Sequence, residues 1–354
     1  MIKIDKINIG LNSKPVIIAE MSANHNHSLD RALKIVESAA STGVQMLKLQ
    51  TYTADTMTLD IDDGDFLIKD KNLWTGHTLH QLYQQAYTPW EWHEPIMKKA
   101  KKLGMLCFSS AFDASAVDFL EKLNVPAYKV ASFENTDLPL IKKIAETGKP
   151  VIVSTGMATL KEIEEVVETI KSSGCKKYVL LKCTSAYPAS SENSNILTIP
   201  DLRKLFNCEV GLSDHTLGIG SALTAVAHGA TVIEKHFTLR RSDGGVDSAF
   251  SIEPQEMKIL VNEAESAWRS LGKISYGPTE LEKPSLKFRR SLYVAEDIQI
   301  NEKFTEKNLR IIRPGHGLAP KYYNQVFGCA VNRKLKKGTA VKWDYLTTKN
   351  KKKF

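Results

Sequence analysis

Two lysines stand inside short apolar runs, where a charged side chain is least expected. Lys48 lies in MLKLQ and Lys129 in AYKVAS, each between two apolar neighbours. Burying such a charge is costly unless an anion lies nearby. We therefore predict a clamp for phosphate and carboxylate groups, assisted by serine hydroxyls. The serines are Ser132, Ser154 and Ser213. A structural ion pair is the alternative, compatible with the first interpretation, and its candidate carboxylates are Glu20, Glu134 and Glu234.

Two histidines, His215 and His236, close neighbouring runs of this kind. Imidazoles on adjacent strand ends could share one Mg²⁺ or Mn²⁺ ion, completed by water or substrate oxygens. A general base and a hydrogen-bonded polar cluster are equally compatible with two histidines alone. Glycine-rich stretches at 211–220 and 243–245 offer backbone N–H groups for anions, but neither matches a dinucleotide or P-loop pattern.

Polar residues end not one but eight apolar runs, and this regularity predicts the fold. The runs are VIIAE (16–20), MLKLQ (46–50), MLCFSS (105–110), AYKVAS (127–132), PVIVSTG (150–156), YVLLKCTS (178–185), EVGLSDH (209–215) and TVIEKHF (231–237). Each run is followed by a segment with helical spacing. Thr88-Pro89 with Glu91, and Thr159 with Glu162, are typical of capping boxes at helix starts. Eight such units favour a (β/α)8 TIM barrel over an open doubly wound sheet, with the active site where the strand ends converge. IKIDKINIG could form a hairpin that closes the barrel bottom.

The chain after residue 272 has a different composition. GKISYGPTELEKP is typical of a linker, and short β-like pieces follow it. We predict a barrel domain over 1–272, a linker over 273–285, a small mostly-β domain over 286–347 and a basic tail over 348–354. Residues 286–354 hold 17 Lys and Arg against 5 Asp and Glu (+12), whereas the first 285 residues hold 31 against 35 (−4).

The composition argues against several function classes. The basic residues lack the interleaved aromatics of a single-strand nucleic-acid binder, so we do not expect a nucleic-acid partner. No run is apolar and long enough for a membrane span, and MIKIDKINIG lacks the apolar core of a secretory signal. Five scattered cysteines without a C-x-x-C pair favour a reducing, cytoplasmic location. The aromatic-rich segment 73–93 could serve helix packing or form the wall of a sugar pocket.

In its motifs the chain resembles the sialic-acid synthase family over nearly its whole length. The matching stretches are IAEMSANHN, KLQTYTADT, FSSAFD, YKVASFENTDLPLI, VIVSTGMA, KCTSAYP, GLSDHTLGIG, VIEKHFTL and GGVDSAFSIEP, and IRPGHGLAP resembles the antifreeze-like (SAF) domain of these synthases. The resemblance implies an enzyme that condenses phosphoenolpyruvate with an open-chain N-acyl amino sugar, with a divalent metal ion as cofactor. It also implies a homodimer in which the SAF domain of one subunit caps the partner's barrel.

The resemblance also assigns roles to residues of this chain. It places around phosphoenolpyruvate Lys48, Ser110, Lys129, Ser132, Ser154, Ser185, Tyr187 and Ser213. His215 and His236 would hold the metal, and Glu20, Glu134 and Asp247 would act near the reacting carbons and the sugar, so that His236 and the three carboxylates are the candidate catalytic residues. Arg313 would reach the sugar in the neighbouring subunit. Ser185 stands where the family has an asparagine, so its hydrogen bond would differ.

Two segments favour the pseudaminic acid branch of the family. LYQQAYTPWEWH resembles that branch, and Phe250 after Asp247 would suit the methyl group of a 6-deoxy sugar. We therefore expect 2,4-diacetamido-2,4,6-trideoxy-L-altrose as the acceptor. The alternatives are an N-acetylneuraminate or legionaminate synthase, a lysine Schiff-base aldolase using Lys48 or Lys129, and a non-enzymatic carbohydrate-binding protein.

Overall fold

The computed structural model describes residues 1–69 and 74–347, and its internal contacts divide the chain into two units, Met1–Gly272 and Lys273–Phe354. The basic tail predicted at 348–354 lies outside the described residues. Within the described ranges, no helix is both long and apolar enough to cross a membrane.

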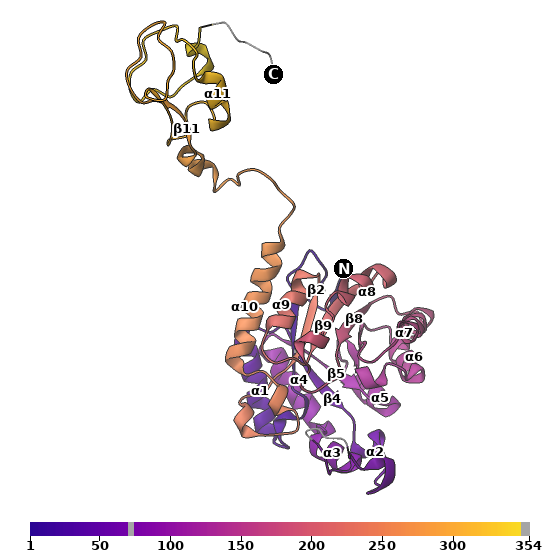
Figure 1. The fold of residues 1–354 in the computed structure, drawn as a ribbon. Coiled ribbons are helices and arrows are strands. Elements are labelled where there is room, and N and C mark those ends of the chain that lie inside the picture. The colour runs from indigo at the N-terminus through magenta and orange to yellow at the C-terminus, as the bar shows by residue number, and fades with distance from the viewer. Residues whose placement is uncertain (70–73, 348–354) are drawn as a thin grey trace. The chain divides into compact units, whose positions relative to one another are not determined.

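The first unit is a closed barrel of eight parallel strands, as the sequence predicts (Figure 1). The strands are β3 (Val16–Glu20), β4 (Met46–Thr51), β5 (Leu106–Ala111), β6 (Tyr128–Val130), β7 (Val151–Ser154), β8 (Tyr178–Cys183), β9 (Glu209–Asp214) and β10 (Val232–His236). They follow one another around the barrel in chain order, and β10 pairs with β3 to close it. Each predicted apolar run therefore contains one barrel strand.

Helices surround the barrel and bury its outer face (Figure 1). They are α1 (Leu29–Thr42), α2 (Ala54–Met57), α3 (Leu79–Ala86), α4 (His93–Lys102), α5 (Ala114–Lys122), α6 (Leu138–Glu146), α7 (Leu160–Ser172), α8 (Thr198–Phe206), α9 (Gly220–Ala227) and α10 (Pro254–Leu271). The predicted capping box at Thr159 and Glu162 is confirmed at the start of α7. The one predicted at Thr88 is wrong, because its hydroxyl bonds Nε2 of His25 (3.0 Å) instead of a helix N–H. A capping box forms earlier, where Thr78 and Gln81 begin α3.

The inside of the barrel changes from apolar to polar along its axis. Its lower half is a buried cluster that includes Ile18, Met46, Phe108, Ala127, Ile152 and Val232. This cluster packs against the hairpin of β1 (Ile2–Ile4) and β2 (Ile7–Ile9), which closes the bottom as expected. Side chains of a strand alternate between its two faces, so the next inward residue lies two positions later. For each of the six residues just named, that next inward residue is polar. They are Glu20, Lys48, Ser110, Lys129, Ser154 and Glu234.

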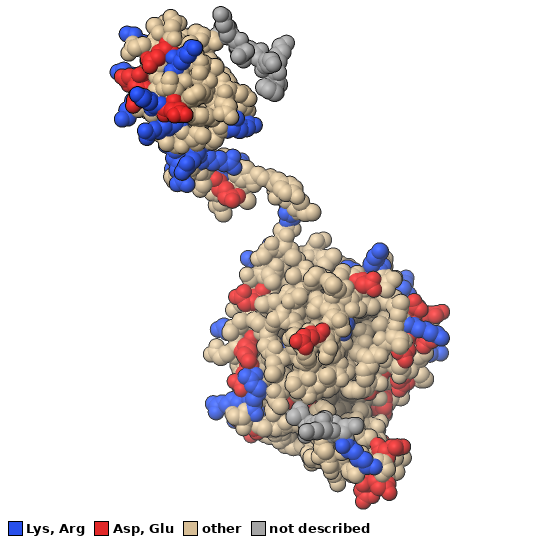
Figure 2. Space-filling view, viewed as in Figure 1, with Lys and Arg blue, Asp and Glu red and all other residues tan. Residues whose placement is uncertain are grey.

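The second unit has a separate small core. Its antiparallel strands β11 (Ser291–Val294) and β12 (Leu309–Ile312) and the short helix α11 (Tyr323–Val326) enclose buried apolar side chains. Those side chains are Leu292, Val294, Ile298, Phe304, Leu309, Val326, Val331, Leu335 and Val341. Figure 2 shows many Lys and Arg side chains on the visible surface of this unit.

Candidate active site

Lys48 lies at the centre of a buried network of charges. Its Nζ is 2.8 Å from Oε2 of Glu20 and 3.4 Å from Oε1 of Glu234, and it donates to Ser110 at 3.2 Å. Burial disfavours the charged lysine, but the two carboxylates outweigh it and raise the pKa of Lys48. Burial raises the pKa of Glu20 to about 7, whereas the two site lysines, Lys129 and Lys48, overcome burial and lower that of Glu234. The ion pair expected as a structural alternative is therefore present.

Lys129 differs from Lys48 in having no carboxylate within ion-pair distance among the described residues. Its side chain is buried, and its Nζ donates to the Ser154 hydroxyl (2.6 Å) and the carbonyl of Val130 (2.8 Å). Burial lowers the pKa of Lys129. A buried ammonium that touches no carboxylate keeps hydrogen-bonding capacity and is only partly compensated by the more distant charge of Glu234, so this position favours binding of an anion.

Ser132 and Ser185 approach each other across Gly156, at the turn that follows β7. The backbone N–H of Gly156 donates to the Ser132 hydroxyl (3.2 Å), and a Cβ at residue 156 would collide with both hydroxyl oxygens. Glycine is therefore required here for close packing. Cys183 lies next to this pair of serines, with its Sγ 3.8 Å from the Ser185 oxygen.

His215 and His236 face each other at the ends of β9 and β10, with ring centroids 5.4 Å apart. Nδ1 of His215 is 3.0 Å from the carbonyl of Thr184, which can only accept, so in the neutral ring the proton lies on Nδ1 and the lone pair on Nε2. Burial lowers the pKa of His236 well below its usual range, which keeps the ring neutral. The rings of Tyr187 and Phe250 pack against the two imidazoles. The ring centroids of Tyr187 and His215 are 4.5 Å apart, and those of Phe250 and His236 are 4.9 Å apart.

Asp247 reaches the charge network through hydrogen bonds. Its Oδ2 accepts from the hydroxyl of Ser22, and Nε2 of Gln50 donates both to Ser22 and to Oε1 of Glu20, at 3.0 Å each. Burial raises the pKa of Asp247. Asp247 and Glu20 therefore belong to one connected polar cluster.

Several buried polar atoms at this end of the barrel lack hydrogen-bond partners among the described residues. They include Glu134 Oε2, Glu234 Oε2 and His236 Nδ1. Glu134 lies in the 3₁₀ helix Ser132–Glu134, two residues after Ser132, and burial raises its pKa to about 7. Unpartnered polar atoms are costly in a closed interior, so they favour a site that binds polar ligands or water.

The barrel thus brings together the sequence-predicted site residues other than Arg313, which is an exposed residue of the second unit. The sequence analysis named Glu234 only as a possible ion-pair partner of the lysines, and it gave no role in the site to Gln50, Ser22 or Cys183. Period-two alternation would have included Glu234, because it lies two residues before His236 on the same strand.

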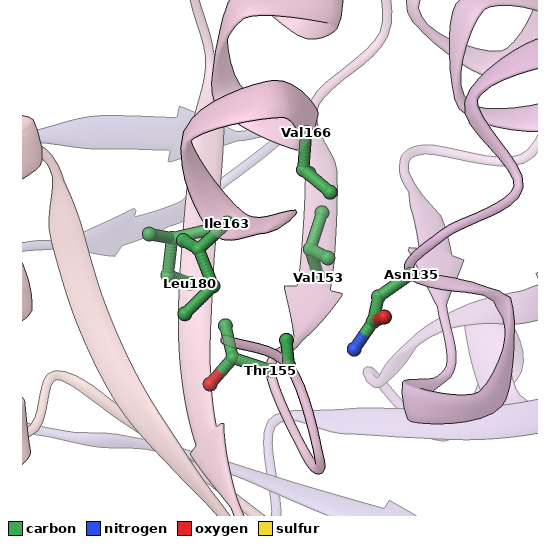
Figure 3. Close-up of a pocket in the computed structure, with 7 residues that line it drawn as sticks. Asn135, Val153, Thr155, Ile163, Val166 and Leu180 are labelled. Atoms are coloured by element: carbon green, nitrogen blue, oxygen red, sulfur yellow. The ribbon is translucent and has the colours of Figure 1, made fainter. Parts of the chain in front are cut away.

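A small packing defect lies in the wall of the barrel, apart from the charged residues described above. Figure 3 shows it between α7 and strands β7 and β8, lined mainly by apolar groups such as Ile163, Val166 and Leu180. It is too narrow for a water molecule, so it is no candidate for the active site.

Comparison with known proteins agrees with this arrangement. The model of the NeuB family matches residues 35–276, and that of the SAF domain matches residues 289–347. The chain is 44% identical over 338 residues to the pseudaminic acid synthase of Campylobacter jejuni, covering 95% of this chain and 97% of that protein. It is 34% identical over 333 residues to the N,N'-diacetyllegionaminic acid synthase of the same species, covering 93% and 99%. The crystal structure of the N-acetylneuraminic acid synthetase from Leptospira borgpetersenii, in complex with citrate, matches with a TM-score of 0.72 at 30% identity, over 81% of this chain and 95% of that chain.

Proposed function

Because this chain belongs to the NeuB family of phosphoenolpyruvate-dependent nonulosonic acid synthases, we propose that it makes pseudaminic acid. The reaction condenses phosphoenolpyruvate with 2,4-diacetamido-2,4,6-trideoxy-L-altrose and releases phosphate. The observation that carries this proposal is the 44% identity to a pseudaminic acid synthase over 95% of the chain, against 34% to a diacetyllegionaminic acid synthase from the same species.

Phosphoenolpyruvate would be held by the lysines and the serines of the barrel. Lys129 is a buried ammonium that forms no ion pair among the described residues, and Lys48 donates a hydrogen bond to Ser110 on the neighbouring strand. We assign phosphate and carboxylate binding to both lysines, with hydroxyl groups that donate to the anionic oxygens. The hydroxyl set is Ser110, Ser132, Ser154, Ser185, Tyr187 and Ser213.

The residues at the ends of β9 and β10 fit a divalent cation, which members of this family generally require. His236 is buried with an unpartnered Nδ1, and the carbonyl of Thr184 fixes the tautomer that leaves Nε2 of His215 available. The described residues contain no group of three or more His, Cys, Asp and Glu arranged for metal binding, so water or substrate oxygens would complete the ligand set. A bound Mn²⁺ or Mg²⁺ would act as a Lewis acid toward the acceptor aldehyde.

The remaining residues would guide the carbon chemistry. Carbon 3 of phosphoenolpyruvate attacks the aldehyde, and positive charge develops at carbon 2. Glu134 or Asp247 would stabilise that charge while water adds, and Glu20 would act beside them. The tetrahedral intermediate then loses phosphate by cleavage of the C–O bond, which leaves the 2-keto acid. Phe250, buried beside His236, would contact the methyl group of the 6-deoxy sugar.

We assign the active form to a homodimer in the cytoplasm, in which Arg313 contacts the sugar bound by the partner's barrel. Support for the dimer comes from charge, because the first 285 residues carry −4 and the rest +12, and opposite net charges favour association of the basic domain with a barrel. Support for the compartment comes from the cysteines, all five of which are free.

Phosphate release by the purified full chain tests the function. The protein is supplied with phosphoenolpyruvate and Mn²⁺, and with either the diacetamido altrose or N-acetylmannosamine. We expect phosphate to be released with the diacetamido altrose but not with N-acetylmannosamine, and we expect EDTA to abolish the release. Release only with N-acetylmannosamine, or only with the legionaminic acid precursor, would move the chain to another branch. With phosphoenolpyruvate labelled with ¹⁸O at the bridging position, the label must leave in phosphate; its retention in the sugar acid would exclude C–O cleavage.

A further inference from the structure

Asp214 and Lys235 form an ion pair next to the two site histidines, on the other face of the same strands. Nζ of Lys235 lies 2.7 Å from Oδ2 of Asp214, and the two side chains are 0% and 1% exposed. They are direct partners in the β9–β10 register, and each immediately precedes a histidine. Because strand side chains alternate, the ion pair points to the outside of the barrel and both imidazoles point inside.

The same pair also fixes the turn that carries His215. Oδ1 of Asp214 accepts from the backbone N–H (2.9 Å) and the hydroxyl (2.8 Å) of Thr216, while Lys235 donates to the Thr216 carbonyl (2.6 Å). Both neighbours of His215 are therefore tied to the residue that precedes His236. No side-chain hydrogen bond from His236 is present among the described residues, so the place of its ring depends on the backbone and on packing.

Stability alone does not explain this ion pair. Burying an ammonium and a carboxylate is expensive, and apolar residues of similar volume often serve a fold as well or better. The hydrogen bonds of Asp214 and Lys235 connect the end of β9, the turn that follows it and the end of β10. A fully satisfied buried network of this kind specifies one geometry, and here it specifies the spacing of the two histidines.

We propose that Asp214 and Lys235 are positioning residues that hold His215 and His236 at the separation a divalent cation requires. This inference rests on the metal site of the proposed function. Without the pair the barrel would still form, but the end of β9 and its turn would move relative to β10. The affinity for the cation would then fall, as it does when outer partners of metal ligands are removed.

The test uses the metal-free full chain and titration calorimetry with Mn²⁺. The double variant Asp214→Asn, Lys235→Met removes both charges at once, and an asparagine oxygen can still accept from Thr216. The single variant Asp214→Asn would leave Lys235 buried without its partner and be less stable, so a second double variant, Asp214→Asn, Lys235→Leu, serves where the first fails to fold. The control is Arg203→Met, Glu209→Gln, which removes a 2.7 Å ion pair at the opposite end of β9. Circular dichroism and melting temperatures compare the folding of all variants.

The inference expects the Kd for Mn²⁺ to rise about tenfold or more in the double variant, with the control near the wild-type value. A folded double variant of either kind that binds Mn²⁺ as tightly as the wild type would overturn the positioning role and leave the metal site intact. If His236→Ala also binds like the wild type, or the wild type does not bind, the metal site itself is wrong and the inference falls with it. Synthase activity in EDTA would then keep the proposed reaction while discarding its metal.

Discussion

At the scale of single residues, two buried lysines of the same barrel have opposite electrostatic situations. Lys48 lies between Glu20 and Glu234, which raise its pKa against the effect of burial. Lys129 has only a hydroxyl and a carbonyl as partners, and burial lowers its pKa. Lys48 therefore stabilises a network through direct ion pairs, whereas Lys129 touches no carboxylate and keeps a charge that phosphate could neutralise.

Replacing each lysine by methionine should separate these situations. Lys129→Met removes a buried charge that forms no ion pair, so it should destabilise the fold much less than Lys48→Met while phosphate release is lost. Lys48→Met leaves two carboxylates unpaired and should lower the free energy of unfolding by about 3–5 kcal/mol, with activity lost as well. Urea unfolding and phosphate release measure both effects. Strong destabilisation by Lys129→Met would contradict the assignment of an open anion position.

Glu134 should make stability depend on pH. Burial raises its pKa to about 7 in the folded protein, against an ordinary value of 4.5. Between these values the folded state binds more protons than the unfolded state, so this residue's contribution to stability falls as pH rises from about 4.5 to about 7. Glu134→Gln should therefore gain stability relative to the wild type across that window and show a constant difference above it.

Melting temperatures at pH 5 and pH 8 measure this effect. The control is Glu168→Gln, which removes an exposed carboxylate of α7 and should leave the pH dependence unchanged. If catalysis requires the ionised carboxylate of Glu134, the wild-type kcat/KM rises as pH approaches 7. The Glu134→Gln variant should not show this rise. A pH profile of stability identical to that of the wild type would show that Glu134 is not buried as described.

At the scale of elements, the sequence predicted the barrel because its strands share one pattern. On six of the eight strands, β3 to β7 and β10, an apolar inner residue is followed two positions later by a polar one, as in Ile18 followed by Glu20 and Ile152 followed by Ser154. This pattern fixes strand order and the site's location without any structure. The ion pair Asp214–Lys235 could not be predicted, because the sequence does not reveal which buried charges are register partners.

The failed prediction at Thr88 has a similar physical reason. A Thr-Pro pair with a following glutamate is typical of a helix start, but the hydroxyl bonds His25, which is 63 residues away in the chain. Local signals decide a helix cap only where no tertiary partner competes for the hydroxyl. The hydroxyl of Thr159 bonds only Glu162 among the described residues, and the capping box forms at the start of α7.

The turn after β7 should tolerate no side chain at residue 156. Gly156→Ala places a methyl group against the hydroxyls of Ser132 and Ser185, so both must move. We expect the KM for phosphoenolpyruvate to rise about tenfold or more, since a small displacement of binding groups can cost two orders of magnitude. Gly220→Ala is the control: it lies at the start of α9, and a methyl group added there would meet no atom within 4 Å. Equal KM values for the two variants would exclude a role for this close approach.

At the scale of the whole molecule, the distribution of charge favours association between two copies of the chain. The first 285 residues carry −4 and the rest +12. Opposite net charges favour association of the two kinds of surface, and a homodimer offers each barrel a second copy of the basic domain. Arg313, exposed in that domain, is the residue that would complete a site in the other subunit.

A heterodimer made from two inactive variants tests this arrangement. Arg313→Ala and Lys129→Met should each be inactive alone, since one lacks the sugar contact and the other the anion site. Co-expression with two different affinity tags allows purification of the mixed dimer. If Arg313 acts on the partner's barrel, one of its two sites has both residues, and activity should return to about half the wild-type value per dimer. If Arg313 acts on its own barrel, each site lacks one residue and the mixed dimer stays inactive. Failure to recover any protein that carries both tags would reject the dimer, so the three results separate exchange between subunits from action within one.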